Sequence, residues 1–291
     1  MISVASYYRP SSLDEALDLM ASRELTPIAG GTDLIPQMRD GESRALIDTR
    51  RLGLDHVKVT DGIVEIGACV THSRLCARLE IRKSLPLLSS AAGVIGSAQI
   101  RNRGTIGGNI VNASPSADTV PVLLNYDAQV VLVSKGGKRS MKLGDFIKWP
   151  YVTDRKPNEL LSLIVCGVSG AVPGAKTSSC FLKLGRRNAM NISRMSLALL
   201  LTAGADGRIK SACVSTGAVF PVARRMREVE RLLSGQIMSK KLFEEAGTLA
   251  TELLITETGV RWSTPYKMPV LKGLLERALY QAARDCGVET T

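Results

Sequence analysis

Metal-binding sequence patterns are missing from this chain. Its 291 residues include six cysteines and two histidines, and no two cysteines are separated by only two residues. Neither His56 nor His72 is placed to complete a ligand set with them, so we expect both to be surface or hydrogen-bonded structural residues. The sequence therefore predicts buried free thiols, with no iron–sulfur cluster, zinc or other metal site on this chain.

Long apolar runs are also missing. No apolar segment reaches the length of a membrane span, and the N-terminal MISVASYYRPSS contains no hydrophobic signal core. We therefore expect a cytoplasmic protein with no membrane partner.

Aromatic residues are scarce, at 4% of the chain. The net charge of +11 is compatible with a nucleic-acid partner, but the basic residues are scattered and few rings are present for base stacking. The densest basic group, in 224–231, is interleaved with Glu228 and Glu230, a pattern that predicts a solvated helix face. We expect no nucleic-acid partner, and only a general attraction for phosphate-bearing cofactors or an acidic subunit.

Apolar residues make up 45% of the chain, enough for a substantial core, and the length allows two domains. Ser12 and Glu15 predict a capping box at the start of a helix. We expect short strands at 26–29, 45–48, 62–70, 129–133, 138–143, 160–166, 180–184, 197–203 and 209–216, and further helices at 85–95, 240–254 and 270–284. The strands at 129–133 and 138–143, and those at 197–203 and 209–216, are expected to pair as hairpins.

Two glycine-rich segments carry the strongest chemical signal. In 27–34 and in 104–109, an apolar stretch meets a Gly-Gly pair that a small polar residue follows. Glycine lets backbone amides converge on an anion, and Thr32, Thr105 and Asn109 add side-chain donors. Two such loops suit a pyrophosphate, although each Gly-Gly alone is equally consistent with a simple turn. Neither segment has the spacing of a Rossmann fingerprint or a P-loop.

The residues of these segments resemble a known family. IAGGTDL followed by QIRNRGTIGGNIVNASPSAD is similar to the paired FAD motifs of the flavoprotein subunits of molybdenum hydroxylases, such as bacterial xanthine, nicotinate and carbon monoxide dehydrogenases. The resemblance extends to SYYRPSSLDEALDLM, CFLKLGRRNAMNIS, SACVSTGAVFPVARRMREVERLL and STPYKMPVLKGLLERAL. It therefore covers nearly the whole chain.

The resemblance implies an α+β fold with two domains. Residues 1–175 would form an FAD-binding domain of the p-cresol methylhydroxylase type, with two subdomains divided near residue 55. Residues 176–291 would form a smaller α+β C-terminal domain, with an antiparallel sheet and helices. The FAD would be bound non-covalently, because no histidine, cysteine or tyrosine marks a known attachment motif.

The implied cofactor-binding residues come from both glycine segments and from three later positions. They are Ile28, Ala29, Gly30, Gly31, Thr32, Asp33, Leu34, Thr105, Ile106, Gly107, Gly108, Asn109, Asp118, Leu161 and Lys183. The first segment would wrap the pyrophosphate and ribitol, and the second would bind the pyrophosphate from the other side. Arg101 and Arg103, beside the second segment, are further candidates to meet a phosphate or an acidic partner.

Three later residues would contact other parts of the FAD. Asp118 would accept a hydrogen bond from the adenosine ribose or a nearby hydroxyl, with a helix N-cap as the alternative. Leu161 would contact the ring system. Lys183 would place its ammonium near the pyrimidine end of the isoalloxazine, where reduced flavin carries negative charge. A surface-strand lysine is the alternative.

The resemblance further implies an oxidoreductase subunit with no catalytic acid or base of its own. Electrons from a large molybdopterin-binding subunit would pass through 2Fe–2S clusters of a small subunit to the FAD, and then to an acceptor such as NAD. The assembly would be a heterotrimer or its dimer. The alternatives are a stand-alone FAD-dependent oxidoreductase of the same fold and a basic nucleic-acid or scaffold protein.

Overall fold

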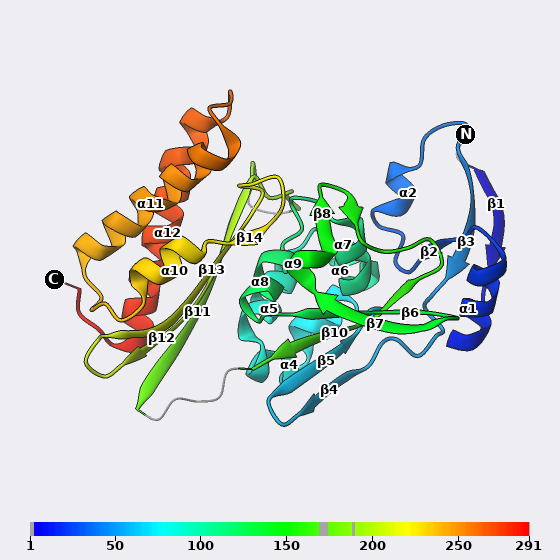
Figure 1. The fold of residues 1–291 in the computed structure, drawn as a ribbon, viewed down its shortest axis with the longest axis horizontal. Helices are drawn as coiled ribbons and strands as arrows, with labels where there is room; N and C mark the ends of the chain where they lie inside the picture. The colour runs from blue at the N-terminus through cyan, green and yellow to red at the C-terminus, as the bar shows by residue number, and fades with distance from the viewer. Residues whose placement is uncertain (1–2, 169–173, 188–189, 291) are drawn as a thin grey trace. The chain divides into compact units, whose positions relative to one another are not determined.

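The computed structural model describes residues 3–168, 174–187 and 190–290. The chain forms two compact units (Figure 1). Unit 1 comprises Met1–Ser114 and Tyr126–Val168, and unit 2 comprises Pro115–Asn125 and Ser169–Thr291. Each unit combines sheets with separate helices, which is the predicted α+β class.

Unit 1 contains ten strands and eight helices within its described residues. The strands are β1 Ser3–Tyr8, β2 Thr26–Ile28, β3 Ser43–Asp48, β4 Val57–Thr60, β5 Ile63–Gly67, β6 Gln129–Ser134, β7 Gly137–Lys142, β8 Ile147–Trp149, β9 Val152–Thr153 and β10 Leu160–Gly167. The helices are α1 Leu13–Ser22, α2 Leu34–Gln37, α3 His72–Ala77, α4 Leu79–Ser84, α5 Pro86–Gly93, α6 Ala98–Arg103, α7 Ile106–Asn112 and α9 Leu143–Phe146.

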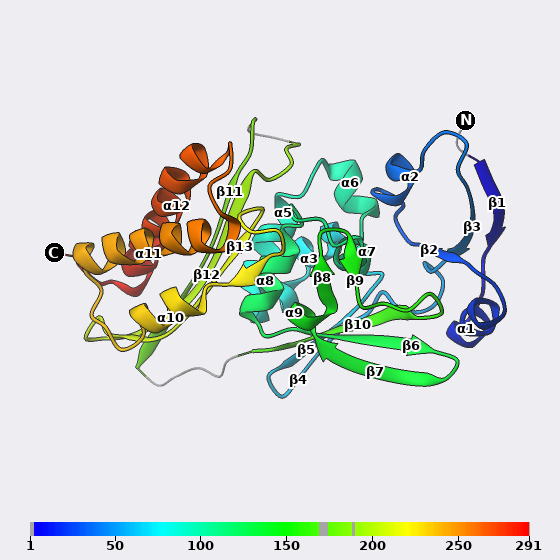
Figure 2. The same ribbon diagram turned by 45° about the horizontal axis from the view of Figure 1, so that its top comes forward.

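Two main sheets organise unit 1. A parallel sheet has the order β1-β3-β2, and an antiparallel sheet has the order β4-β5-β10-β6-β7. Figure 2 shows the antiparallel strands side by side, with the predicted β6–β7 hairpin at one edge. In β6, Val130 and Leu132 are fully buried and alternate with more exposed neighbours, as expected for a strand with one face on a core. Strands β8 and β9 form a separate pair.

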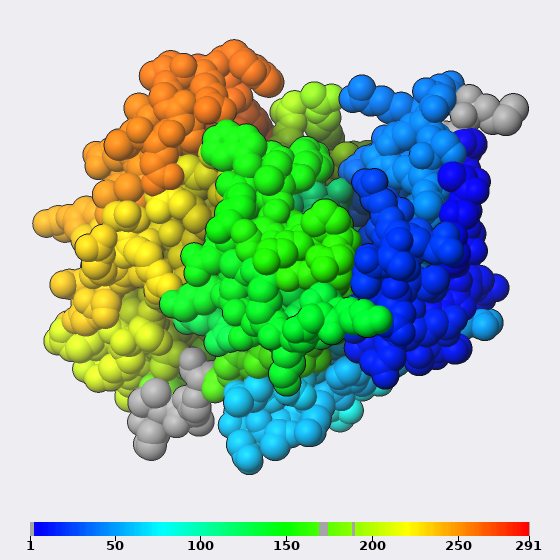
Figure 3. All heavy atoms as spheres, turned by 45° about the vertical axis from the view of Figure 1, so that its right-hand side comes forward, coloured from blue at the N-terminus to red at the C-terminus, as the bar shows by residue number. Residues whose placement is uncertain are grey.

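Helix α1 begins with a cap that differs in one bond from the prediction. The hydroxyl of Ser12 accepts a hydrogen bond from the backbone N–H of Glu15, at 3.2 Å. The carboxylate of Glu15 accepts from the N–H and hydroxyl of Ser11, both at 2.8 Å, one residue further back than expected. In Figure 3 this helix lies against the tip of the β6–β7 hairpin, where Lys135 and Asp18 form an ion pair at 2.7 Å.

Unit 2 is built on one antiparallel sheet, ordered β11-β12-β13-β14. Its strands are β11 Ala175–Leu184, β12 Met195–Gly204, β13 Ile209–Gly217 and β14 Arg224–Arg225, and its helices are α8 Thr119–Asn125, α10 Arg227–Leu233, α11 Lys240–Thr258 and α12 Thr264–Cys286. Leu197, Leu199 and Leu201 of β12 are fully buried in one cluster with residues of α10, α11 and α12. Figure 1 shows α11 and α12 on one face of the sheet and α8 on the other.

The segment 224–231 agrees only in part with the predicted solvated helix face, because Arg227 and Arg231 are exposed on α10 but other residues of the segment are not. Arg224 and Arg225 form β14, and helix α10 begins only at Arg227. The side chains of Arg225 and Glu230 are 9% and 8% exposed and form an ion pair at 2.8 Å. Glu230 also accepts a hydrogen bond from the backbone N–H of Val214 at 2.9 Å. Because a buried carboxylate needs hydrogen-bonding partners, Glu230 depends on its contacts with Arg225 and Val214. These contacts attach α10 to β13 inside the unit.

The six cysteines are free thiols. Cys69, Cys166, Cys180 and Cys286 are buried, as expected, whereas Cys76 and Cys213 are partly exposed. Among the residues that the structure describes, no group of histidine, cysteine and acidic side chains could hold a metal ion. No helix in the described ranges combines the length and the apolar character that a membrane crossing requires.

Helix α8 is attached to the sheet of unit 2 by one buried amide, that of Asn125. Its Nδ2 donates to the carbonyl oxygens of Ala198 at 2.9 Å and Cys213 at 3.0 Å, and its Oδ1 accepts from the hydroxyl of Ser215. Asn125 is 3% exposed. These bonds fix a segment that precedes the rest of unit 2 by more than forty residues of sequence.

We expect Asn125→Ala to lower the free energy of unfolding by about 2 to 4 kcal/mol, because it leaves buried polar groups without partners. Urea unfolding followed by circular dichroism measures this change. Asn158→Ala, at an exposed position, is the matched control and should change the value by less than about 0.5 kcal/mol. Equal values for the two variants would contradict the attachment role of Asn125.

Candidate functional site

The two glycine segments meet backbone to backbone in unit 1. The first begins at the end of β2 and leads into α2, and the second consists of the two residues that link α6 to α7 together with the first turn of α7. A Cβ at Gly30 would lie 2.0 Å from the carbonyl oxygen of Arg103, so a residue with a side chain cannot be accommodated without moving a loop. The Nε of Arg103 donates to the carbonyl oxygen of Gly30 at 3.3 Å. Arg103 therefore holds the first loop, a role that the sequence prediction did not give it.

The second loop also packs closely, against Ala68, the residue that follows β5. A Cβ at Gly107 would lie 2.6 Å from the Cβ of Ala68, and the backbone N–H of Gly107 donates to the carbonyl oxygen of Ala68 at 2.9 Å. The hydroxyl of Thr105 accepts from the backbone N–H of Gly108 at 3.1 Å. Thr105 is thus the N-cap of α7, and its hydroxyl hydrogen is still able to meet a ligand.

A cavity of about 590 Å³ opens where the loops meet, within the size range of small-molecule sites. Twelve of the fifteen predicted residues line it: Ile28, Ala29, Gly30, Gly31, Thr32, Asp33, Leu34, Thr105, Gly107, Gly108, Asn109 and Leu161. Ile106 is fully buried beneath the second loop, and Asp118 and Lys183 belong to unit 2. The structure therefore brings the two loops and Leu161 around one space, as a pyrophosphate site requires.

Positive charge predominates among the ionisable side chains that line the cavity. Arg39, Arg44 and Arg155 are basic, and Asp33 is acidic. Arg44 forms an ion pair with Glu42. Burial raises the pKa of Asp33. The sequence prediction missed all three arginines, because each lies outside the glycine motifs and becomes part of the cavity only through the fold.

His72 differs from its prediction as a surface or hydrogen-bonded residue. It lines the cavity and is only 3% exposed, and its Nδ1 has no hydrogen-bond partner in the described part of the chain. Burial, together with the charge of Arg101, lowers the pKa of His72 to about 4, so the imidazole is neutral at pH 7. Its backbone N–H donates to the carbonyl oxygen of Gly104 at 3.0 Å, which places the ring beneath the second loop.

His56, in contrast, is exposed, and its Nδ1 lies 3.1 Å from the carbonyl oxygen of Gly53. The prediction for His56 as a surface structural residue is therefore confirmed.

Two further predicted residues, Lys183 and Asp118, form an ion pair in unit 2. The ammonium of Lys183 lies 2.7 Å from Oδ2 of Asp118, and their side chains are 10% and 5% exposed. Oδ1 of Asp118 accepts from the hydroxyl of Ser193 at 2.6 Å. Burial raises the pKa of Asp118, and the charge of Lys183 opposes this shift. Lys183 is therefore not the surface-strand lysine of the alternative interpretation.

Comparison with known proteins assigns both parts of the chain to flavoprotein families. Residues 3–166 match the family described as the FAD binding domain in molybdopterin dehydrogenase. The chain belongs to this family. Residues 180–282 match the CO dehydrogenase flavoprotein C-terminal domain. The resemblance to the flavoprotein subunits of molybdenum hydroxylases is thereby confirmed.

Individual relatives of this family extend over nearly the whole chain. The glyceraldehyde dehydrogenase medium chain of Sulfolobus acidocaldarius is 32% identical over 96% of this chain and 98% of its own length. The nicotinate dehydrogenase FAD-subunit of Eubacterium barkeri is 28% identical, over 93% of each chain. A solved structure of a Cu,Mo-CO dehydrogenase superposes with a TM-score of 0.89, at 26% identity, over 98% of this chain and 99% of that chain. The chain is thus an oxidoreductase subunit of this flavoprotein family, and the predicted fold class is confirmed.

The residues around the cavity fit FAD. The backbone N–H groups of Gly30, Gly31 and Thr32 donate to no acceptor among the described residues, and neither glycine carries a side chain that would shield them, so a pyrophosphate can meet them. The basic lining suits the two negative charges of that group. The buried Nδ1 of His72, without a partner among the described residues, is a further polar atom beside the loops.

We expect Gly30→Ala to weaken FAD binding by the full chain at least tenfold, because the new Cβ forces the two loops apart. Gly167→Ala is the matched control, since a Cβ there would meet no atom within 4 Å. Fluorescence titration with FAD measures affinity, and circular dichroism checks that each variant is folded. Wild-type affinity in a folded Gly30→Ala protein would show that the loop contact is not needed for binding.

Proposed function

We propose that this chain is the FAD-carrying electron-relay subunit of a molybdenum hydroxylase. The single observation that supports this most is the contact of two glycine loops around one cavity, in a chain whose two parts both match flavoprotein families. Residues 1–175 would serve as the flavin domain, divided near residue 55, and 176–291 as the C-terminal domain. We also propose that the protein is cytoplasmic.

The backbone amides of 28–34 would hold the pyrophosphate of a non-covalently bound FAD, residues 105–109 would bind it from the other side, and Leu161 would lie against a ring. FAD can exchange electrons singly or in pairs, which suits a relay between iron–sulfur clusters and a two-electron acceptor such as NAD. The chain's own residues would bind the cofactor, exclude water and set the local charge. No residue of this chain would act in the hydroxylation itself.

Lys183 and Asp118 need a joint assignment. Because their charged atoms are 2.7 Å apart, they would meet the same part of a bound FAD, so the adenosine end and the isoalloxazine end cannot each receive one of them. We assign both to the isoalloxazine, where the ammonium would stabilise negative charge of the reduced ring. Asp118 would then orient Lys183, and Ser193 would orient Asp118.

The partners would be a large molybdopterin-binding subunit and a small subunit with 2Fe–2S clusters, in a heterotrimer or its dimer. Relatives named as a medium chain and as an FAD-subunit support this arrangement. This chain would hold the FAD within reach of both the small subunit and the acceptor.

Purification of the tagged chain from its native cells tests this function. We expect one FAD per chain, released intact on denaturation, together with partner polypeptides that contain molybdenum and iron. A chain that purifies without partners, and whose FAD is reduced directly by an organic substrate, would instead be a stand-alone flavoenzyme. A well-folded complex without flavin would contradict both interpretations.

We expect Lys183→Met to lower the reduction potential of bound FAD by several tens of millivolts, since about 30 mV corresponds to about 1.4 kcal/mol for two electrons. Lys176→Met, on the same strand but exposed, is the control and should leave the potential unchanged. Spectroelectrochemical titration measures both. Equal potentials in wild type and Lys183→Met would remove Lys183 from the flavin site.

A further inference from the structure

One wall of the cavity comes from a segment outside both glycine motifs. Tyr151, Arg155, Leu160 and Leu161 line the cavity, and of these only Leu161 belongs to the sites that the family resemblance implies. Arg155 stands out because it is a half-buried cation. The other two basic residues of the lining differ from it, since Arg39 is exposed and Arg44 is paired with Glu42.

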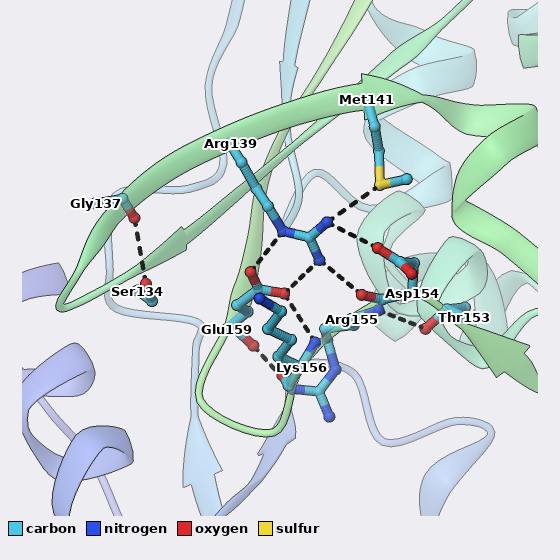
Figure 4. Close-up of polar contacts among 9 residues, drawn as sticks. All are labelled: Ser134, Gly137, Arg139, Met141, Thr153, Asp154, Arg155, Lys156 and Glu159. Carbon is cyan, nitrogen blue, oxygen red and sulfur yellow. Dashed lines mark hydrogen bonds and ion pairs between the residues drawn. The ribbon is translucent and has the colours of Figure 1, made fainter.

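The segment around Arg155 is anchored by Arg139 of β7 (Figure 4). The guanidinium of Arg139 donates to both carboxylate oxygens of Glu159, at 2.7 and 2.8 Å. It also donates to the carboxylate and the carbonyl oxygen of Asp154, both at 2.7 Å. Arg139 lowers the pKa of both carboxyl groups. The two acids nearest to Arg155 in sequence are therefore already paired with another arginine.

Arg155 itself is held by neutral groups. Its Nη1 donates to the carbonyl oxygens of Lys156, Pro157 and Glu159, at 3.1, 3.3 and 2.8 Å. Neither its Nε nor its Nη2 donates to a residue that the structure describes. In Figure 4 its guanidinium points away from that of Arg139. Burial lowers the pKa of Arg155, with Glu159 opposing the shift, so the cavity wall contains a charge that its own chain compensates only weakly.

We propose that Arg155 binds a phosphate oxygen of the FAD pyrophosphate through its guanidinium. This inference rests on the proposed function, because it takes FAD as the ligand of the cavity. The pyrophosphate is the anionic group of FAD at neutral pH, and a guanidinium can donate two parallel hydrogen bonds to a phosphate. The three carbonyl contacts of Nη1 fix the orientation of the side chain. Arg139 acts as a positioning residue, since it fixes the loop on the β6–β7 hairpin.

The test uses the full chain stripped of flavin and titrated with FAD at several salt concentrations. We expect Arg155→Met to raise the Kd for FAD at least tenfold and to make binding less dependent on salt, because one screened charge pair is lost. Arg155→Lys should recover part of the affinity and most of the salt dependence, since it keeps the charge without the planar fork. Lys156→Met removes a neighbouring charge that does not line the cavity, and it should match wild type in both properties.

A purely structural role for Arg155 gives a different result. Arg155→Met would then weaken FAD binding only as far as it lowers the melting temperature of the flavin-free chain, with unchanged salt dependence and no rescue by lysine. That result, or wild-type affinity in Arg155→Met, would overturn the assignment of Arg155. Failure of the wild-type chain to bind FAD would instead overturn the proposed function.

Discussion

The close backbone contact between Gly30 and Arg103 is the constraint on which the site depends. It requires a residue without a side chain at position 30, and it brings together two loops that are more than seventy residues apart in sequence. Neither loop alone encloses a space, and each could be a simple turn. Their contact creates a cavity lined by amides and glycine α-carbons, which is the surface that a pyrophosphate needs.

Rigid elements hold these loops in place. The first loop is fixed between β2 and α2, and the second packs on Ala68, directly after β5. The wall that contains Arg155 is fixed to the β6–β7 hairpin by Arg139. Buried hydrogen bonds have the same anchoring role in unit 2, where Asn125 attaches α8 to the sheet and Glu230 attaches α10 to it. Binding groups on such supports lose little additional freedom when a ligand arrives.

Local features of the fold could be predicted from the sequence, and contacts between distant residues could not. The glycine segments, the β6–β7 and β12–β13 hairpins and the long C-terminal helices follow from short-range patterns. The buried position of His72, the pairing of Lys183 with Asp118 and the cavity position of Arg155 depend on tertiary contacts, and no spacing rule indicates them. The burial of Arg225 and Glu230 also differs from the prediction, because charge alternation looks the same on a solvated helix and in a buried ion pair.

Amide hydrogen exchange with and without FAD tests the central claim most directly. If both glycine loops hold the pyrophosphate, FAD should slow exchange at the amides of 28–34 and of 104–109 together, while the exposed turn residues Ala205 and Asp206 should not change. Slower exchange at only one of the two loops, or at neither while FAD is bound, would contradict the account.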